Sequence, residues 1–78
     1  MKELVQYLAR SLVNNPDAVD VNETESDAAS VVRLKVAKED LGRIIGKQGR
    51  TAKSIRTILN AAASRANRKV VLEIVEEE

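Results

Sequence analysis

Apolar residues in the first part of the chain recur with two different periods. Between residues 2 and 14 they follow the three- and four-residue spacing of an amphipathic helix. Pro16 ends this helix, because the residue before a proline is driven out of helical conformations. In residues 18–23 and 30–37 apolar residues alternate with polar ones, which predicts two strands with one buried face each. The residues of the second strand that we expect to face the core are Val32, Leu34 and Val36.

The second part of the chain predicts two helices joined by a glycine-containing loop and followed by a strand. A short helix is expected over residues 38–45, where Glu39 and Asp40 suit the positive end of the first turn. A longer helix is expected from the loop to about residue 66. Its apolar side consists of Ala52, Ile55, Ile58, Leu59, Ala62 and Ala66. Residues 70–75 alternate again and predict the last strand, with Val70, Leu72 and Ile74 facing inward.

This order of elements predicts an α+β fold of two layers, with a three-stranded mixed sheet covered by helices on one face. The first two strands can pair as a hairpin. The two helices between the second and third strands form a crossover, which makes those strands parallel. At 78 residues we expect one domain over residues 1–78, with a frayed acidic tail at 76–78.

The loop between the two helices reads Gly46-Lys47-Gln48-Gly49. Glycine permits a sharp turn and close backbone approach to a ligand, and we expect Gly46 to end the shorter helix in a left-handed conformation. The following helix begins with unpaired N–H groups and a positive dipole end, to which Lys47 and Arg50 add two formal charges. The pattern predicts phosphate binding at this corner.

Charge is segregated along the chain although the formal net charge is only +1. Residues 41–72 contain no acid and eight bases: Arg43, Lys47, Arg50, Lys53, Arg56, Arg65, Arg68 and Lys69. Such a block favours a polyanionic partner. A solvated helix surface is the alternative for the basic face of the longer helix. For Arg65, Arg68 and Lys69 the favoured explanation is the dipole at the helix C-terminus.

Several functional classes lack the residues they need. The chain has no histidine and no cysteine, so the usual general base, the commonest metal ligand and thiolate sites are missing. The segment "GRIIGKQ" is no P-loop, since its glycines lie one residue too close and Gln48 replaces the magnesium-binding hydroxyl. We therefore expect no catalytic residues, no metal and no cofactor. Without a long apolar run or a secretory signal, we expect a cytoplasmic protein that does not contact the membrane.

Three consecutive segments, "DLGR", "IIGKQG" and "RTAKSIRTIL", resemble a KH domain of the type II topology. Over almost its whole length the chain is similar to the bacterial single-KH-domain RNA-binding proteins of the KhpA family. It departs from the general KH pattern at the third position after the second glycine, which is often isoleucine and is Ala52 here. Because alanine is smaller than isoleucine, the first turn of the longer helix contributes less apolar surface.

The resemblance implies that the loop backbone clamps a single RNA strand of about four nucleotides, with its bases over an apolar groove between helices and sheet. Ile44 or Ile45 would floor that groove. The residues that would contact RNA are Arg43, Ile45, Gly46, Lys47, Gln48, Gly49, Arg50, Lys53 and Arg56. The lone aromatic residue, Tyr7, lies far from the loop in sequence, so we expect low sequence specificity.

The resemblance also implies a role in post-transcriptional regulation or as an RNA chaperone, and two kinds of protein partner. These are a second copy of the chain and a larger Jag-type KH protein, KhpB. An alternative function follows from them: a protein-interaction module that pairs with such a partner and binds RNA only weakly. A steep salt dependence of RNA binding by the isolated chain would distinguish the first function from the second.

Overall fold

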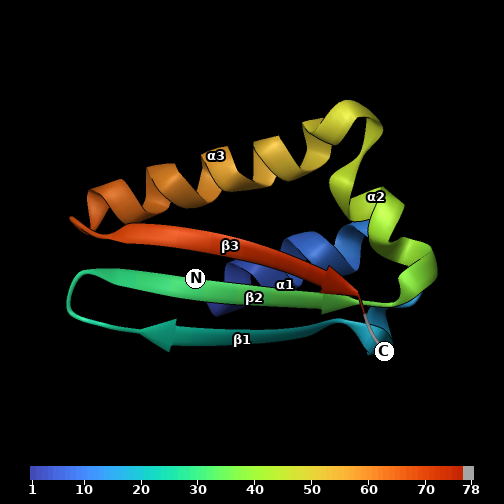
Figure 1. Ribbon diagram of the computed structural model, residues 1–78, viewed down its shortest axis with the longest axis horizontal. Coiled ribbons are helices and arrows are strands. Elements are labelled where there is room, and N and C mark those ends of the chain that lie inside the picture. Colours follow the sequence, from blue (N-terminus) through green and yellow to red (C-terminus); the bar gives the residue numbers. More distant parts are fainter. Residues whose placement is uncertain (77–78) are drawn as a thin grey trace.

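A computed structural model of the chain describes residues 1–76 and has the predicted order of elements (Figure 1). The helices are α1 (Lys2–Leu12), α2 (Leu41–Ile45) and α3 (Arg50–Arg65). The strands are β1 (Asp20–Glu25), β2 (Ala29–Val36) and β3 (Lys69–Glu76). Single 3-10 turns cover Pro16–Ala18, Lys38–Asp40 and Lys47–Gly49, so the loop itself is one such turn between α2 and α3.

The sheet has the order β1-β2-β3 and is mixed, as predicted. β1 pairs antiparallel with β2, placing Val21 opposite Leu34, and β2 pairs parallel with β3, placing Leu34 opposite Ile74. Every second residue of β2 faces the helices, and its Val32, Leu34 and Val36 are fully buried. The helices pack on this face through residues that share one core with the strands: Val5, Ala9, Ile44, Ile55 and Leu59. The prediction of an α+β fold with helices on one face of the sheet is confirmed.

The buried face of α3 differs from the predicted one. Its buried residues are Ala52, Ile55, Leu59 and Ala63. Ile58 is 45% exposed and Ala66 is also exposed, so our placement of these two residues in the core is wrong. Neighbouring residues lie about 100° apart around a helix, and a core centred on Leu59 therefore leaves Ile58 on the flank. Ala63, which we did not predict to be buried, follows Leu59 by one turn on the side that meets the sheet.

Smaller differences affect the ends of elements. The first helix ends at Leu12 instead of residue 14, and β1 begins only at Asp20 because a 3-10 turn precedes it. At the other end, Glu76 is the last residue of β3 and pairs with Val36, so the strand extends one residue into the expected frayed tail. The remaining tail residues, 77–78, lie outside the described residues.

Arg68 holds the end of α3 to the β1–β2 hairpin. Asn67 has a positive φ of 60°, and the Arg68 N–H donates to the carbonyl of Ala63 at 2.9 Å, which closes the helix in a Schellman-type turn. The Arg68 guanidinium donates to the carbonyl of Ser26 in the hairpin at 2.8 Å. Arg68 therefore has a structural role as an anchor between α3 and the hairpin, in addition to the position near the helix C-terminus that we had favoured.

Candidate nucleic-acid interface

The loop between α2 and α3 contains three residues with positive φ. Gly46 has φ 76° and ψ 174°, so its φ is positive as expected but it is not in the left-handed helical conformation. That conformation is adopted by Gln48 (φ 57°, ψ 26°) and Gly49 (φ 75°, ψ 12°) instead. The 3-10 turn is closed by the Gly49 N–H, which donates to the Gly46 carbonyl at 3.1 Å. The four residues thus form a compact corner with a defined backbone.

The two glycines have different physical roles. A Cβ on Gly46 would collide with the side chain of Thr51 in the first turn of α3, so Gly46 allows the loop to pack against its own helix. A Cβ on Gly49 would meet nothing within 4 Å. Glycine is therefore favoured at position 49 by the positive φ of 75° and not by a lack of space. Without a side chain, Gly49 also leaves the start of α3 open to a ligand. Within the described residues no side-chain hydrogen bond caps the start of α3, although the Arg50 N–H donates to the Lys47 carbonyl of the preceding 3-10 turn. The positive end of the α3 dipole favours an anion at this place.

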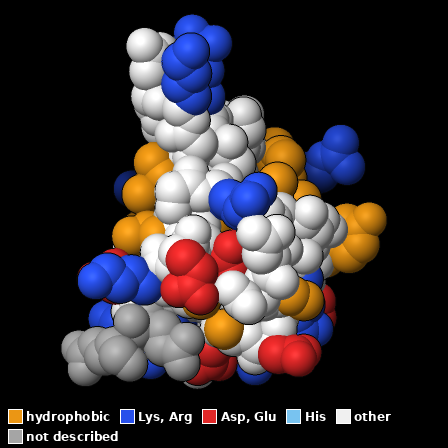
Figure 2. Space-filling view, turned by 90° about the vertical axis from the view of Figure 1, so that its right-hand side faces the viewer, with side chains coloured by type: hydrophobic (Ala, Val, Ile, Leu, Met, Phe, Trp, Pro, Cys, Tyr) orange, Lys and Arg blue, Asp and Glu red, His pale blue; other side chains and the backbone are white. Residues whose placement is uncertain are grey.

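The structure brings most of the predicted RNA-binding residues to this corner. Lys47 and Gln48 are exposed in the loop, and Gly46 and Gly49 are half-buried in it. Arg43 is exposed on the short α2, and Arg50 and Lys53 are exposed in the first turn of α3. Figure 2 shows this end of the molecule, with Lys and Arg side chains at the top of the view and acidic side chains only lower down. The corner is basic, convex and open to solvent.

The two isoleucines before the loop differ in their surroundings. Ile44 is fully buried in the core, whereas Ile45 is 39% exposed. Of the two candidates for a groove floor, only Ile45 has apolar surface that a ligand could contact, while Ile44 packs α2 onto the sheet.

Arg56 lies apart from the loop residues, beside a hollow between α3 and β3. The hollow has a volume of about 180 Å³ and is lined by Arg56, Leu59, Asn60, Val70, Val71 and Leu72. Nη2 of Arg56 lies 3.5 Å from the Leu72 carbonyl and donates a hydrogen bond to it. An apolar floor with a guanidinium and an amide at its rim suits a flat, partly polar group such as a nucleobase.

Asn60 and the β3 residues of this hollow were not among the predicted site residues. Asn60 follows Arg56 by four residues and therefore shares its side of α3, which is a signal available from the sequence. Whether Val70 and Val71 line the hollow depends on which edge of the sheet α3 covers. The alternation of residues within a strand does not determine that edge.

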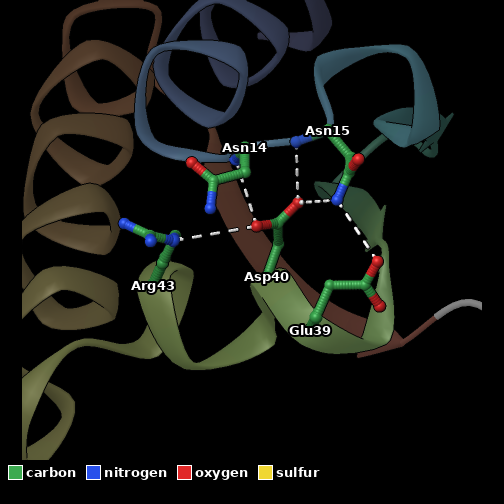
Figure 3. Close-up of polar contacts among 5 residues, drawn as sticks. All are labelled: Asn14, Asn15, Glu39, Asp40 and Arg43. Atoms are coloured by element: carbon green, nitrogen blue, oxygen red, sulfur yellow. Dashed lines mark hydrogen bonds and ion pairs between the residues drawn. The ribbon is translucent and has the colours of Figure 1, made fainter.

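Asp40 forms a second polar centre directly before α2 (Figure 3). Its side chain is only 1% exposed, and it accepts the backbone N–H groups of Asn14 and Asn15 at 3.0 Å each. The side-chain amide of Asn15 donates to the same carboxylate at 3.2 Å, and Nε of Arg43 lies 3.8 Å from it. These contacts tie the chain after α1 to the start of α2.

The surroundings of Asp40 favour its ionised form. Burial raises the pKa of this carboxyl group, but the hydrogen bonds from Asn14 and Asn15 and the positive charge of Arg43 lower it by more. The net pKa lies below the ordinary value of 3.8. We had predicted only a favourable position in the helix dipole, and the buried carboxylate was missed because its partners come from residues more than 20 positions earlier in the chain.

Within residues 1–76, no cluster of three or more His, Cys, Asp or Glu residues could hold a metal ion. No helix among these residues has the length and apolar character needed to cross a membrane.

Comparison with known proteins agrees with this architecture. Residues 2–74 match the family model described as "KhpA/KhpB, KH domain". The chain is 53% identical over 75 residues to the RNA-binding protein KhpA of Clostridium perfringens, covering 96% of this chain and all of the relative. It is 49% identical over 77 residues to the RNA-binding protein KhpA of Chlamydia trachomatis, covering 99% of both chains. No solved structure matches the chain.

The family is non-enzymatic, as expected from the residues that the chain lacks. The helix-strand-strand-helix-loop-helix-strand order, the mixed sheet and the match along 2–74 lead to one conclusion: the chain belongs to the KhpA/KhpB family of KH-domain proteins and has the type II KH fold.

Proposed function

We propose that this chain is a cytoplasmic RNA-binding protein that clamps the sugar-phosphate backbone of a single strand with the Gly46–Gly49 loop. The observation that carries the proposal is the exposed basic corner formed by Arg43, Lys47, Arg50 and Lys53 around a helix start that has no side-chain cap among the described residues. Relatives named RNA-binding protein KhpA support it, since they align with nearly the whole chain. Its cellular role would be post-transcriptional regulation or RNA chaperoning.

In this proposal the loop and the hollow act on different parts of the strand. Phosphates lie against the backbone of the loop, where the dipole of α3 and the basic side chains attract negative charge. Ile45 lies beneath the part of the RNA strand closest to the loop. The bases farther along the strand lie over the hollow beside Arg56. The phosphate contacts fix the position of the strand and supply most of the affinity, but they carry no sequence information.

Low sequence specificity follows from the side chains available. Tyr7, the chain's one aromatic residue, is on α1 and does not line the hollow. Base stacking would therefore rely on aliphatic side chains and the guanidinium of Arg56, without the aromatic platforms that hold bases in many single-strand binders.

The salt dependence of binding tests this proposal. If three to five phosphates are contacted, a plot of log K against log salt concentration should have a slope of roughly −2 to −3.5, because each contact with a single strand contributes about −0.7. The measurement is fluorescence anisotropy of a short labelled single-stranded RNA titrated with the protein. A flat plot would mean that the basic corner does not neutralise phosphates.

The exposed side chain of Ile58 favours a second candidate function, a module that pairs with another protein. Ile58 lies on the flank of α3, and its 45% exposure leaves apolar side-chain surface there that the core does not use. Two partners are proposed, a second copy of the chain and a larger Jag-type KH protein such as KhpB. In this alternative the chain pairs with its partner through this flank of α3 and binds RNA only weakly.

Substituting Ile58 by Lys tests the interaction candidate. The side chain is half exposed, so we expect the melting temperature to change by only a few degrees and the affinity for RNA to stay near that of the parent. If Ile58 is part of a protein interface, self-association measured by light scattering should be lost. Unchanged association in a folded I58K variant would exclude this flank of α3 as the contact surface.

A further inference from the structure

Among the described residues, Arg43 is the one basic residue of the loop corner that forms an ion pair with a buried carboxylate. Its Nε lies 3.8 Å from Oδ1 of Asp40, while the Arg43 side chain as a whole is 54% exposed. Figure 3 shows the guanidinium turned with Nε toward Asp40 and its terminal nitrogens away from it. Arg43 is on α2, three residues before Gly46 and so at the entrance to the loop.

We propose that Asp40 is a positioning residue for RNA binding, which holds Arg43 in an orientation that presents its terminal nitrogens to a phosphate beside the loop. The proposal rests on the proposed function, since it assigns a partner to one of the phosphate-binding side chains. It concerns a residue that does not itself contact the RNA.

The rigidity of Asp40 is the first part of the argument. Two backbone N–H groups, from Asn14 and Asn15, and the amide of Asn15 donate to its two oxygens at 3.0 to 3.2 Å. Because the donors are mostly backbone, the carboxylate is fixed by the fold. A carboxylate that is 1% exposed and fixed in this way can orient a neighbouring side chain, which an exposed and mobile carboxylate cannot.

The shape of the arginine head group is the second part. A guanidinium has five N–H donors in a plane, and the pair of terminal nitrogens can bind two phosphate oxygens at once. With Nε directed to Asp40, these terminal donors remain available on the solvent side. A lysine or an unrestrained arginine would lose more side-chain freedom on binding, so the pair increases affinity by preorganisation.

The other charged group near this pair does not replace Asp40. Glu39 is exposed, and its Oε1 accepts the side-chain amide of Asn15 at 3.3 Å. Within the described residues its carboxylate makes no ion pair with Arg43. The orienting contact on Arg43 thus comes from Asp40 alone among the described residues.

A double-mutant cycle tests the proposal. The dissociation constant of a short single-stranded RNA is measured for the parent, D40N, R43Q and the double variant, with K53Q made in both backgrounds as the matched control. If Asp40 positions Arg43, R43Q should weaken binding about 3- to 10-fold in the parent and much less in the D40N background. K53Q should weaken binding by the same factor in both backgrounds, since Lys53 is not paired with Asp40.

An equal effect of R43Q in the two backgrounds would overturn the proposal and leave Asp40 with a structural role only. Should D40N not fold, the mobility of the Arg43 Nε–H group is measured in the parent by ¹⁵N relaxation. Its order parameter is expected to be higher than that of Arg50, which has no partner among the described residues, and equal order parameters would contradict the pairing. Failure of the parent itself to bind RNA would instead contradict the proposed function.

Discussion

Replacing Lys47 and Gln48 together by Asp is expected to weaken RNA binding by roughly 30- to 1000-fold while the domain stays folded. Both side chains are exposed, so no core contact is lost. Gly46 and Gly49 remain, and Asp tolerates the positive φ of position 48 better than most residues do. The substitution changes the local charge by −3, since one positive and one neutral side chain become two negative ones.

The physical reason for so large an effect is the position of the new charges. They would stand where the phosphates are proposed to lie, so a favourable contact is replaced by repulsion between like charges. Together these changes should reduce the binding free energy by about 2–4 kcal/mol. The measurement is fluorescence anisotropy with single-stranded RNA at moderate salt, with circular dichroism to show that the variant is folded.

A matched control separates the local effect from the overall change in charge. The double variant K2D/T24D changes the net charge by the same amount, but Lys2 is at the start of α1 and Thr24 near the hairpin end of β1. Only a small loss of affinity is expected, because charges farther apart than the Debye length, about 10 Å at 0.1 M salt, are largely screened. Equal losses in the two double variants would show that the loop is not the phosphate clamp.

Replacing Asp40 by Ala is expected to reduce the free energy of unfolding by on the order of 2–4 kcal/mol. The backbone N–H groups of Asn14 and Asn15 would lose their acceptor, and α2 would lose its tie to the segment after α1. The matched control is E39A. Glu39 is the adjacent acid, but it is exposed and accepts one side-chain hydrogen bond at 3.3 Å, so its removal should change stability by less than about 1 kcal/mol.

The pH dependence of stability identifies the same carboxylate. Because the pKa of Asp40 is lowered in the folded state, its ionised form stabilises the fold above the ordinary value of 3.8, and this contribution is lost as the pH falls through the lowered pKa. Urea denaturation between pH 7 and strongly acid pH should show a weaker acid destabilisation in D40A than in the parent. A D40A variant as stable as the parent at pH 7, or with the same acid dependence, would contradict this account.

The strands and their pairing were predictable because alternation is a local property of the sequence. The alternating apolar residues of β2 identify its buried face, and the two helices that follow require a parallel partner for it. The same reasoning was less successful for α3. Ile58 is as apolar as Ile55, and only the contact with the sheet determines that the buried stripe includes Ala63 and not Ile58. Apolar character alone therefore does not locate the edge of a buried face.

The candidate site was predictable to the extent that it is local. The loop and the bases within one turn of it lie together because they are neighbours in sequence. Asp40 was not recognised, since its partners Asn14 and Asn15 meet it only through the packing of α1 beside α2. The resemblance implied an apolar groove between helices and sheet, but the residues of β3 that line the hollow were not identified, for the same reason. Both depend on contacts between elements, which periodicity does not describe.

The central claim is that RNA lies along the Gly46–Gly49 loop and the start of α3, and NMR tests it most directly. In a titration of the ¹⁵N-labelled protein with a short single-stranded RNA, the account predicts the largest changes in amide shift at residues 46–50. Smaller changes should follow at Lys53 and along the hollow at Val70–Leu72, while Asn22 and Thr24 on β1 stay unchanged. Largest changes on β1 or α1, with the loop amides unmoved, would contradict it.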